Sequence, residues 1–344
     1  MHGPRTMNRK FTLASRPETL PGPEHFAIAG EEMPPLADGQ VRLRLAFAAV
    51  SPWQAQRCKD FANYVEPFAI GELISCDMLG EVVESKAAGW RTGDYAMGRL
   101  GWQEYADAAP AALTRCDPAL SAGTWLTALS SPGLSAWFGF ADHARPMPGE
   151  TCVITSAAGA LGSFAVQIAV AAGARVVGIA GGPEKCRFVT EDLGAAACLD
   201  YREPDLEGRL RTAAPDGVHV FFDTVGGPTG DAVFANMAKY GRIVLVGRSA
   251  ANNSEDPGAD FANLRMVWAR ECTVETFSMY SLLPERRAEG RKRMAALVRS
   301  GAVTPRFTLV DGFEQTPKAL HDVLAGELLG KALVRYWQPA GIQA

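Results

Sequence analysis

The chain has few residues of the kinds that build metal centres or disulfide frameworks. Its 344 residues include only five histidines and seven cysteines, and no two cysteines form a C-x-x-C pair. Structural zinc sites need clustered thiolates or imidazoles, so we predict a protein without a metal ion. The odd number of scattered cysteines also argues against a disulfide framework and favours the reducing cytoplasm as the location.

Long apolar runs and a strong charge of one sign are missing as well. The formal net charge is -4, with 34 basic and 38 acidic side chains. We therefore expect no nucleic-acid partner and no membrane partner, because these need basic surfaces or long apolar segments. One basic run, residues 284–301, also carries an apolar face and is predicted to be a solvated amphipathic helix.

Two different periodicities are present along the chain. Residues 1–123 have the short, alternating strands of a small β-barrel, whereas short β-branched runs alternate with helix-length segments from residue 124. The second pattern indicates βαβ units and a parallel sheet covered on both faces. Residues 308–344 read strand, helix, turn, strand, and do not extend that series. The predicted fold class is therefore α/β with two domains, the first made from residues 1–123 and 308–344, the second from residues 124–307.

The stretch VITSAAGALGSFAVQIA predicts a dinucleotide-binding turn between a strand and a helix. It holds an A-x-G-x-x-G pattern, whose candidate cofactor-binding residues are Ala158, Gly159, Ala160, Leu161 and Gly162. A glycine at the third position lets the backbone approach a pyrophosphate, and one at the sixth lets the helix pack close to the strand. The alternative is a tight strand-to-helix turn with nothing bound.

The stretch VVGIAGGPEKCRF bears on which dinucleotide is bound. NAD-binding folds keep an acidic residue about 20 positions after the turn, where it binds the ribose hydroxyls. Gly181 occupies that place here, and Lys185 follows in the next predicted helix. A lysine there can bind the 2′-phosphate of NADPH, which an acid would repel. The alternative for Lys185 is an ordinary exposed lysine.

These residues, together with SPGLSAWFG, FFDTVGG, YGRIVLVG and the terminal LLGKALVRY, resemble the prostaglandin reductase and leukotriene B4 12-hydroxydehydrogenase branch of the medium-chain dehydrogenase/reductases. The resemblance covers essentially the whole chain. It implies a GroES-like catalytic domain built from both chain ends, with a Rossmann domain inserted between them. It also implies that Lys185 and Tyr201 bind the 2′-phosphate of NADPH. The further cofactor-binding residues expected are Ser135, Thr224, Gly247, Arg248 and Phe277.

The chain departs from this branch around the nicotinamide and the substrate. Thr224 and Leu328 replace two asparagines of the family, Asn252 replaces a substrate-contacting tyrosine, and SPWQA stands where the family has DPYMR. Tyr64, in NYVEPF, keeps the family's other tyrosine. We therefore take Tyr64 and Asn252 as catalytic candidates. The alternative for Tyr64 is a loop tyrosine that anchors a strand. Arg248 has three alternatives, namely an acidic substrate, the cofactor phosphates or solvent.

The leading functional hypothesis is a zinc-independent, NADPH-dependent reduction of the C=C bond of α,β-unsaturated aldehydes or ketones. Hydride addition to the β-carbon builds charge on the carbonyl oxygen, which a hydrogen-bond donor can stabilise. The alternatives are a zinc-free quinone reductase and a non-catalytic NADPH-binding protein. We also expect a homodimer through the edge of the Rossmann sheet, because residues 270–281 read as an exposed β-branched strand.

Overall fold

The computed structural model describes residues 7–60, 66–247 and 263–344. The chain divides into two compact units, Met1–Leu126 with Phe307–Ala344, and Thr127–Arg306. The boundaries predicted from the sequence lie after residues 123 and 307. Over the described ranges, no helix is long and apolar enough to cross a membrane.

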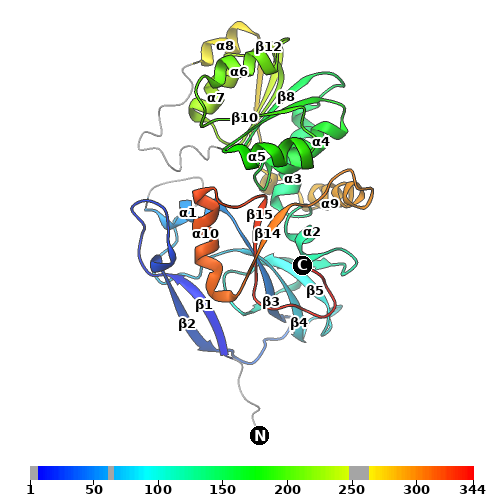
Figure 1. The fold of residues 1–344 in the computed structure, drawn as a ribbon. Coiled ribbons are helices and arrows are strands. Elements are labelled where there is room, and N and C mark those ends of the chain that lie inside the picture. The colour runs from blue at the N-terminus through cyan, green and yellow to red at the C-terminus, as the bar shows by residue number, and fades with distance from the viewer. Residues whose placement is uncertain (1–6, 61–65, 248–262) are drawn as a thin grey trace. The chain divides into compact units, whose positions relative to one another are not determined.

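The first unit is built on a largely antiparallel sheet in the order β14-β15-β3-β4-β5-β7, with β6 also paired to β3. β15 lies between β14 and β3, so strands from both ends of the chain share one sheet (Figure 1). The first unit contains β1 (Met7–Leu13), β2 (Phe26–Glu32), β3 (Val41–Val50), α1 (Pro52–Cys58), β4 (Asp77–Ser85), β5 (Tyr95–Arg99), β6 (Tyr105–Ala108), β7 (Thr114–Cys116), α2 (Ala122–Leu126), β14 (Phe307–Asp311), α10 (Thr316–Ala325) and β15 (Lys331–Arg335).

The second unit is a parallel sheet in the order β10-β9-β8-β11-β12-β13. This is the doubly wound Rossmann order, in which the strand order reverses between β8 and β11. The unit contains α3 (Ser131–Phe138), a π-helix η3 (Gly139–Ala144), β8 (Thr151–Thr155), α4 (Gly162–Ala171), β9 (Arg175–Ala180), α5 (Pro183–Arg187), a π-helix η4 (Phe188–Asp192), β10 (Ala197–Asp200), α6 (Leu206–Ala213), β11 (Val218–Asp223), α7 (Gly227–Phe234), β12 (Met237–Leu245), α8 (Leu264–Ala269), β13 (Thr273–Thr276) and α9 (Pro284–Arg299).

The predicted fold class is confirmed, because an α/β parallel sheet and a second, strand-rich unit are both present. The basic run forms α9, with Met294 fully buried on its apolar face. Two elements are shorter than the sequence suggests. The helix-length segment PTGDAVFANMAKY, residues 228–240, is helical only to Phe234, because Met237 already pairs with Val218 of β11. The edge strand expected over residues 270–281 is confined to β13.

Candidate cofactor site

The glycine-rich turn lies at the end of β8, where the chain turns directly into α4. Ser156 has a left-handed backbone (φ 49°), and its carbonyl accepts the Gly159 N–H at 2.8 Å. A Cβ on Gly162 would lie 2.1 Å from that same carbonyl oxygen, far inside contact distance. Only glycine therefore lets α4 begin this close to the turn. The first N–H groups of α4 consequently face the same edge of the sheet as the end of β8.

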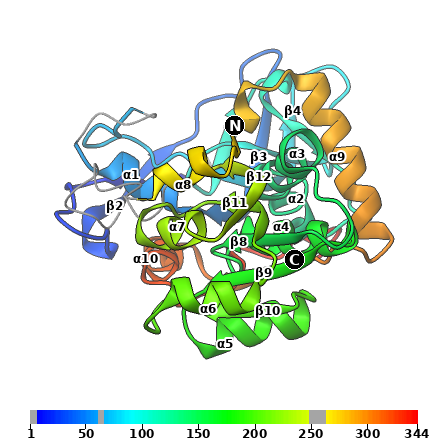
Figure 2. The same ribbon diagram turned by 90° about the horizontal axis from the view of Figure 1, so that it is seen from above.

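The second part of the site lies where β9 and β10 end, beside α5 (Figure 2). Gly181 follows β9, and a Cβ there would lie 2.8 Å from the ring of Tyr201 and 3.1 Å from Nε of Arg202. A larger residue at this position would therefore require the Tyr201 ring and the Arg202 side chain to move. Gly182 then turns the chain into α5 with φ 94°, which favours glycine. Both glycines thus leave room for the two side chains that follow β10.

Lys185 and Arg202 bring two positive charges to this corner, beside the acids Glu184 and Asp200. Burial lowers the pKa of the half-buried Lys185, and the positive charge of Arg202 lowers it further. The opposing charge of Glu184 does not cancel these effects. Two cations that destabilise each other in this way would be stabilised by a bound dianion. Arg202 was not predicted as a site residue, although it directly follows Tyr201.

Asp200 holds the Arg202 segment in place. Its Oδ1 accepts the Arg202 N–H at 2.9 Å. Burial favours the neutral acid, but the backbone N–H groups of Arg202 and Gly182 outweigh it and lower the pKa of Asp200. The carboxylate is therefore charged at neutral pH and fixes the turn that carries Arg202.

The carboxyl ends of β8, β11 and β12 form the centre of the site. Thr155 Oγ1 donates to Oδ1 of the buried Asp223 at 2.7 Å and accepts the Thr224 N–H at 2.9 Å. Asp223 Oδ1 also accepts the Val225 N–H at 2.9 Å. A Cβ on Gly247 would lie 3.1 Å from the Thr224 carbonyl oxygen, so the two chain segments touch. The structure thus brings Thr224 and Gly247 together, through a network that the sequence alone did not reveal.

The remaining candidates lie elsewhere or are not described. Ser135 is buried in α3, and Phe277 stacks on His143 with 4.8 Å between ring centroids. Tyr64, Arg248 and Asn252 lie outside the described residues. Leu328, which replaces a family asparagine, packs against the apolar core of the first unit.

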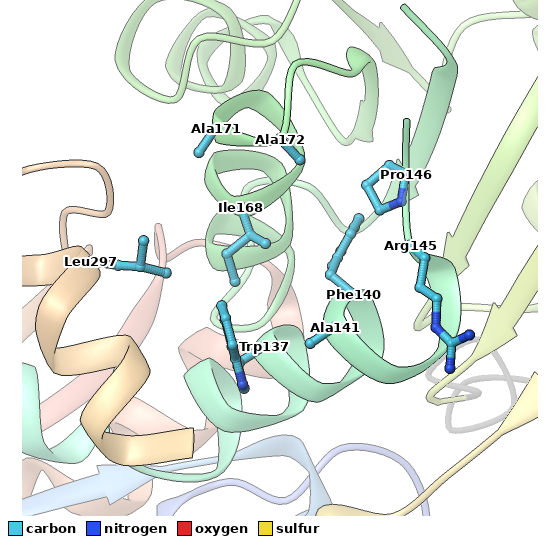
Figure 3. A pocket seen from close by; sticks show the side chains of 9 residues that line it. All are labelled: Trp137, Phe140, Ala141, Arg145, Pro146, Ile168, Ala171, Ala172 and Leu297. Atoms are coloured by element: carbon cyan, nitrogen blue, oxygen red, sulfur yellow. The ribbon is translucent and has the colours of Figure 1, made fainter. Parts of the chain in front are cut away.

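An apolar pocket lies on another part of the second unit. Trp137, Ile168 and Leu297 line it, from α3, α4 and α9 (Figure 3). Ala171 and Ala172, at the last turn of α4, also contribute. The helix runs about 15 Å from Gly162 to that end, so the pocket is separate from the nucleotide turn. We assign it no role.

The first unit contains a polar cluster that was not predicted from the sequence. Lys331 is 5% exposed, and its Nζ donates a hydrogen bond to Ser51 Oγ. Burial lowers the pKa of Lys331 to about 8, although the charge of Asp77 acts in the opposite direction. Ser51 stands where the resembling family has the aspartate of DPYMR, so a hydroxyl takes the place of a carboxylate beside this lysine.

No group of three or more His, Cys, Asp or Glu side chains suitable for a metal ion occurs among the residues that the structure describes. The absence of zinc stays a prediction, which metal analysis of purified protein would test.

The Rossmann order and its glycine-rich turn, in one chain with a strand-rich unit, define a two-domain, dinucleotide-dependent oxidoreductase. Family models agree with this class: residues 9–116 match the N-terminal domain of oxidoreductase, and residues 160–299 match the zinc-binding dehydrogenase family. The chain belongs to the medium-chain dehydrogenase/reductase superfamily, in the branch that contains the prostaglandin reductases.

The relatives match over nearly their whole length. NADPH-dependent curcumin reductase of Escherichia coli is 32% identical over 95% of this chain and 96% of its own. Prostaglandin reductase 1 of mouse is 31% identical over 95% and 98%. The crystal structure of CurA in complex with NADPH from Vibrio vulnificus has a TM-score of 0.90 at 30% identity, covering 96% of this chain and 100% of that one. The predicted family and enzyme class are thus confirmed.

Proposed function

We propose that the protein is an NADPH-dependent reductase that saturates the C=C bond of α,β-unsaturated ketones or aldehydes, and that it acts in the cytoplasm. The observation that carries the cofactor assignment is the pair of cations Lys185 and Arg202 beside Tyr201, with Gly181 at the position where an NAD-binding fold keeps an acid. The relatives' names, which include NADPH-dependent curcumin reductase, support the same cofactor. Curcumin is itself a conjugated enone, which supports the substrate class.

The residues present fit the two charged ends of NADPH. A pyrophosphate suits the N-terminus of α4, where Gly159 and Gly162 keep side chains away from the backbone. A 2′-phosphate suits Lys185 and Arg202, because its oxygens can accept charge-assisted hydrogen bonds from both cations. When bound, the cofactor supplies the hydride. The protein binds and orients both reactants and stabilises the charge that develops on the carbonyl oxygen.

A substrate panel tests the proposal. Purified protein with NADPH is offered enones, enals and quinones, and the products are identified. We expect turnover of enones to the saturated ketones, with the carbonyl intact. Turnover of quinones alone would establish the neighbouring quinone reductase activity instead. Cofactor binding without any turnover would favour a non-catalytic NADPH-binding protein.

We predict that Lys185→Ala weakens NADPH binding about ten- to a hundredfold and leaves NADH binding nearly unchanged. A hydrogen bond to a charged group contributes roughly 1.5–3 kcal/mol, and NADH lacks the phosphate that receives it. Arg202→Ala should show the same selectivity. The measurement is the Kd of each cofactor by titration calorimetry. Arg211→Ala is the matched control, because it removes an exposed cation of α6 paired with Glu207. Equal losses for NADPH and NADH would refute the assignment.

We predict that Tyr64→Phe lowers kcat/KM by about tenfold to a few hundredfold, in or below the range for a lost oxyanion donor. A phenol with an ordinary pKa near 10 is protonated at neutral pH, so it can donate to the developing enolate oxygen. NADPH affinity should stay the same. Steady-state kinetics on the best enone of the panel measure the effect. Full activity in the variant would mean that Tyr64 has only a structural role. Asn252 and Arg248 would then be the hydrogen-bond donors to test.

We propose a homodimer that joins the edges of two Rossmann sheets. All four residues of β13 are exposed, with Val274 45% exposed, and its free edge can pair with another strand. Glu275 contacts His143, so the strand's one charge is engaged within the unit. Light scattering at micromolar concentration should give twice the chain mass of 36.7 kDa. Val274→Lys should shift the protein to monomer, and a monomeric wild type would disprove the dimer.

A further inference from the structure

We propose that His143 is a positioning residue for hydride transfer, because it holds Phe277 and the chain after β13 in place on the nicotinamide side of the cofactor site. His143 lies in the π-helix η3, and Phe277 directly follows β13. The inference rests on the NADPH-dependent reduction proposed above. It gives His143 a role in the rate of the reaction rather than in the affinity for the cofactor.

The strand order places the end of β13 on the nicotinamide side. A Rossmann sheet binds a dinucleotide across the crevice between its two halves, with one mononucleotide on each half. Lys185 and Arg202, the proposed partners of the 2′-phosphate, lie beside β9 and β10, so that half takes the adenosine. The nicotinamide half therefore lies over the carboxyl ends of β11, β12 and β13.

Phe277 lies beside a chain segment that is joined to the centre of the site. β12 and β13 pair in register up to Leu245 and Thr276, so Phe277 follows at the level of Val246. The Val246 N–H donates a hydrogen bond to the Asp223 carbonyl oxygen at 2.8 Å, which connects this level to the end of β11. The end of β13 is thus part of the edge of the sheet that carries the central network.

His143 holds Phe277 and its strand at two points. Its Nδ1 is hydrogen-bonded to Oε2 of Glu275, and its ring stacks on the Phe277 ring, with 4.8 Å between the centroids and 19° between the planes. Glu275 and Phe277 are two residues apart, which agrees with side chains on the same face of an extended chain. A Cβ on Gly139 would lie 3.3 Å from Cε1 of Phe277, so the start of η3 also lies close to this ring.

The π-helix that carries His143 is itself fixed to the sheet. Phe140 stacks on Phe222 of β11 with 5.0 Å between ring centroids, and Nε of Arg242 in β12 donates to the Ala144 carbonyl at 2.8 Å. π-helices are rare and are frequently found at functional sites. Removing the His143 ring deletes the stacked contact with Phe277 and allows the chain after β13 to move relative to the rest of the site.

The test separates the orientation of the nicotinamide from the affinity for the cofactor. NADPH-loaded His143→Ala is mixed with the best enone of the panel, and the loss of NADPH absorbance gives the rate of a single hydride transfer. We expect that rate to fall about tenfold, because a misplacement of about 1 Å can lower a reaction rate by as much as a hundredfold. The Kd of NADPH should stay close to that of the wild type, because the proposed phosphate contacts are intact.

A second measurement does not need turnover. The nicotinamide of bound NADPH is fluorescent, and the anisotropy of its emission falls when the ring gains mobility in its site. We expect a lower anisotropy with His143→Ala than with the wild type. Both proteins should have equal Kd values for ADP-ribose that carries the 2′-phosphate, because this probe lacks the nicotinamide. His143→Phe keeps a ring that can stack on Phe277 and should recover most of the rate and the anisotropy.

His219→Ala is the matched control. His219 Nδ1 accepts the Thr151 N–H at 3.2 Å, but at the amino ends of β8 and β11, far along the strands from the cofactor site. This variant should keep the wild-type rate and anisotropy. A thermal melt shows which variants are folded, and His143→Leu, with the same expected results, replaces His143→Ala if the alanine variant does not fold.

An unchanged rate and anisotropy without the His143 ring would overturn the inference, and so would a His143→Phe variant that recovers neither. If the wild type binds NADPH but reduces no enone, the proposed reaction is wrong, and the anisotropy still decides the role of His143. A wild type that binds no NADPH would overturn both proposals.

Discussion

Gly162→Ala should reduce NADPH affinity at least a hundredfold and lower the melting temperature of the protein. The new Cβ would lie 2.1 Å from the Ser156 carbonyl oxygen and 2.9 Å from the Ala157 Cα. Both are backbone atoms, so no side-chain rotation relieves the overlap, and α4 must move by about 1 Å from the turn. Overpacking of this kind typically costs about 1–3 kcal/mol. Each hydrogen bond to the cofactor phosphates that is lost costs roughly 1.5–3 kcal/mol, so the loss of two weakens NADPH binding by about a hundredfold or more.

Calorimetric titration with NADPH and a thermal melt measure the two effects. Gly30→Ala is the matched control, because it adds the same methyl group where the nearest atom, in the Met7 side chain, is 3.6 Å away. That variant should keep wild-type affinity. Normal NADPH binding by Gly162→Ala would mean that the cofactor does not use this turn.

The second large effect is a dependence of stability on pH that comes from Lys331. Burial lowers the pKa of its ammonium group in the folded state to about 8, from 10.5. Below pH 8 both the folded and the unfolded chain are protonated, so the full penalty of a buried charge is present. Between pH 8 and 10.5 the unfolded chain binds more protons than the folded one, so stability rises with pH. Over this window the gain is about 3 kcal/mol.

Urea denaturation of wild type and Lys331→Met at several pH values isolates this effect. Other groups titrate in both proteins, so the informative quantity is the difference between the two free energies of unfolding. It should be constant below pH 7 and should move in favour of the wild type by about 2–3 kcal/mol by pH 10.

The absolute difference at pH 7 is less informative, because the methionine leaves the Ser51 hydroxyl without its donor. The double variant Ser51→Ala, Lys331→Met removes both partners and should be more stable than Lys331→Met alone. Lys86→Met, which changes a lysine 44% exposed at its side chain, should give no such pH dependence. A difference that does not change with pH would mean that Lys331 keeps its ordinary proton affinity when folded.

The features predicted correctly from the sequence are those that depend on residues close together along the chain. The turn from Ala157 to Gly162 and the helix after it require glycines at fixed positions. The spacing of these glycines can be read directly from the sequence. Arg202 was missed because an arginine after a strand resembles any surface residue until Gly181 is seen beside it. Lys331 was missed for a similar reason, because burial depends on the strands β14 and β3 that flank it. The strand β13 was overestimated because β-branched residues alone do not show where pairing with β12 ends.

The first unit also has a consequence for synthesis on the ribosome. β3 and β15 are paired neighbours, with Val50 opposite Ala332, so about 280 residues separate partners in one sheet. At about 5–20 residues per second, β3 waits roughly 15 seconds to one minute for its partner. Meanwhile the second unit, which is contiguous from Thr127 to Arg306, can fold completely. We therefore expect the nascent chain to hold a finished nucleotide-binding unit while the edge of β3 stays open, which makes this interval the one in which chaperones are most needed.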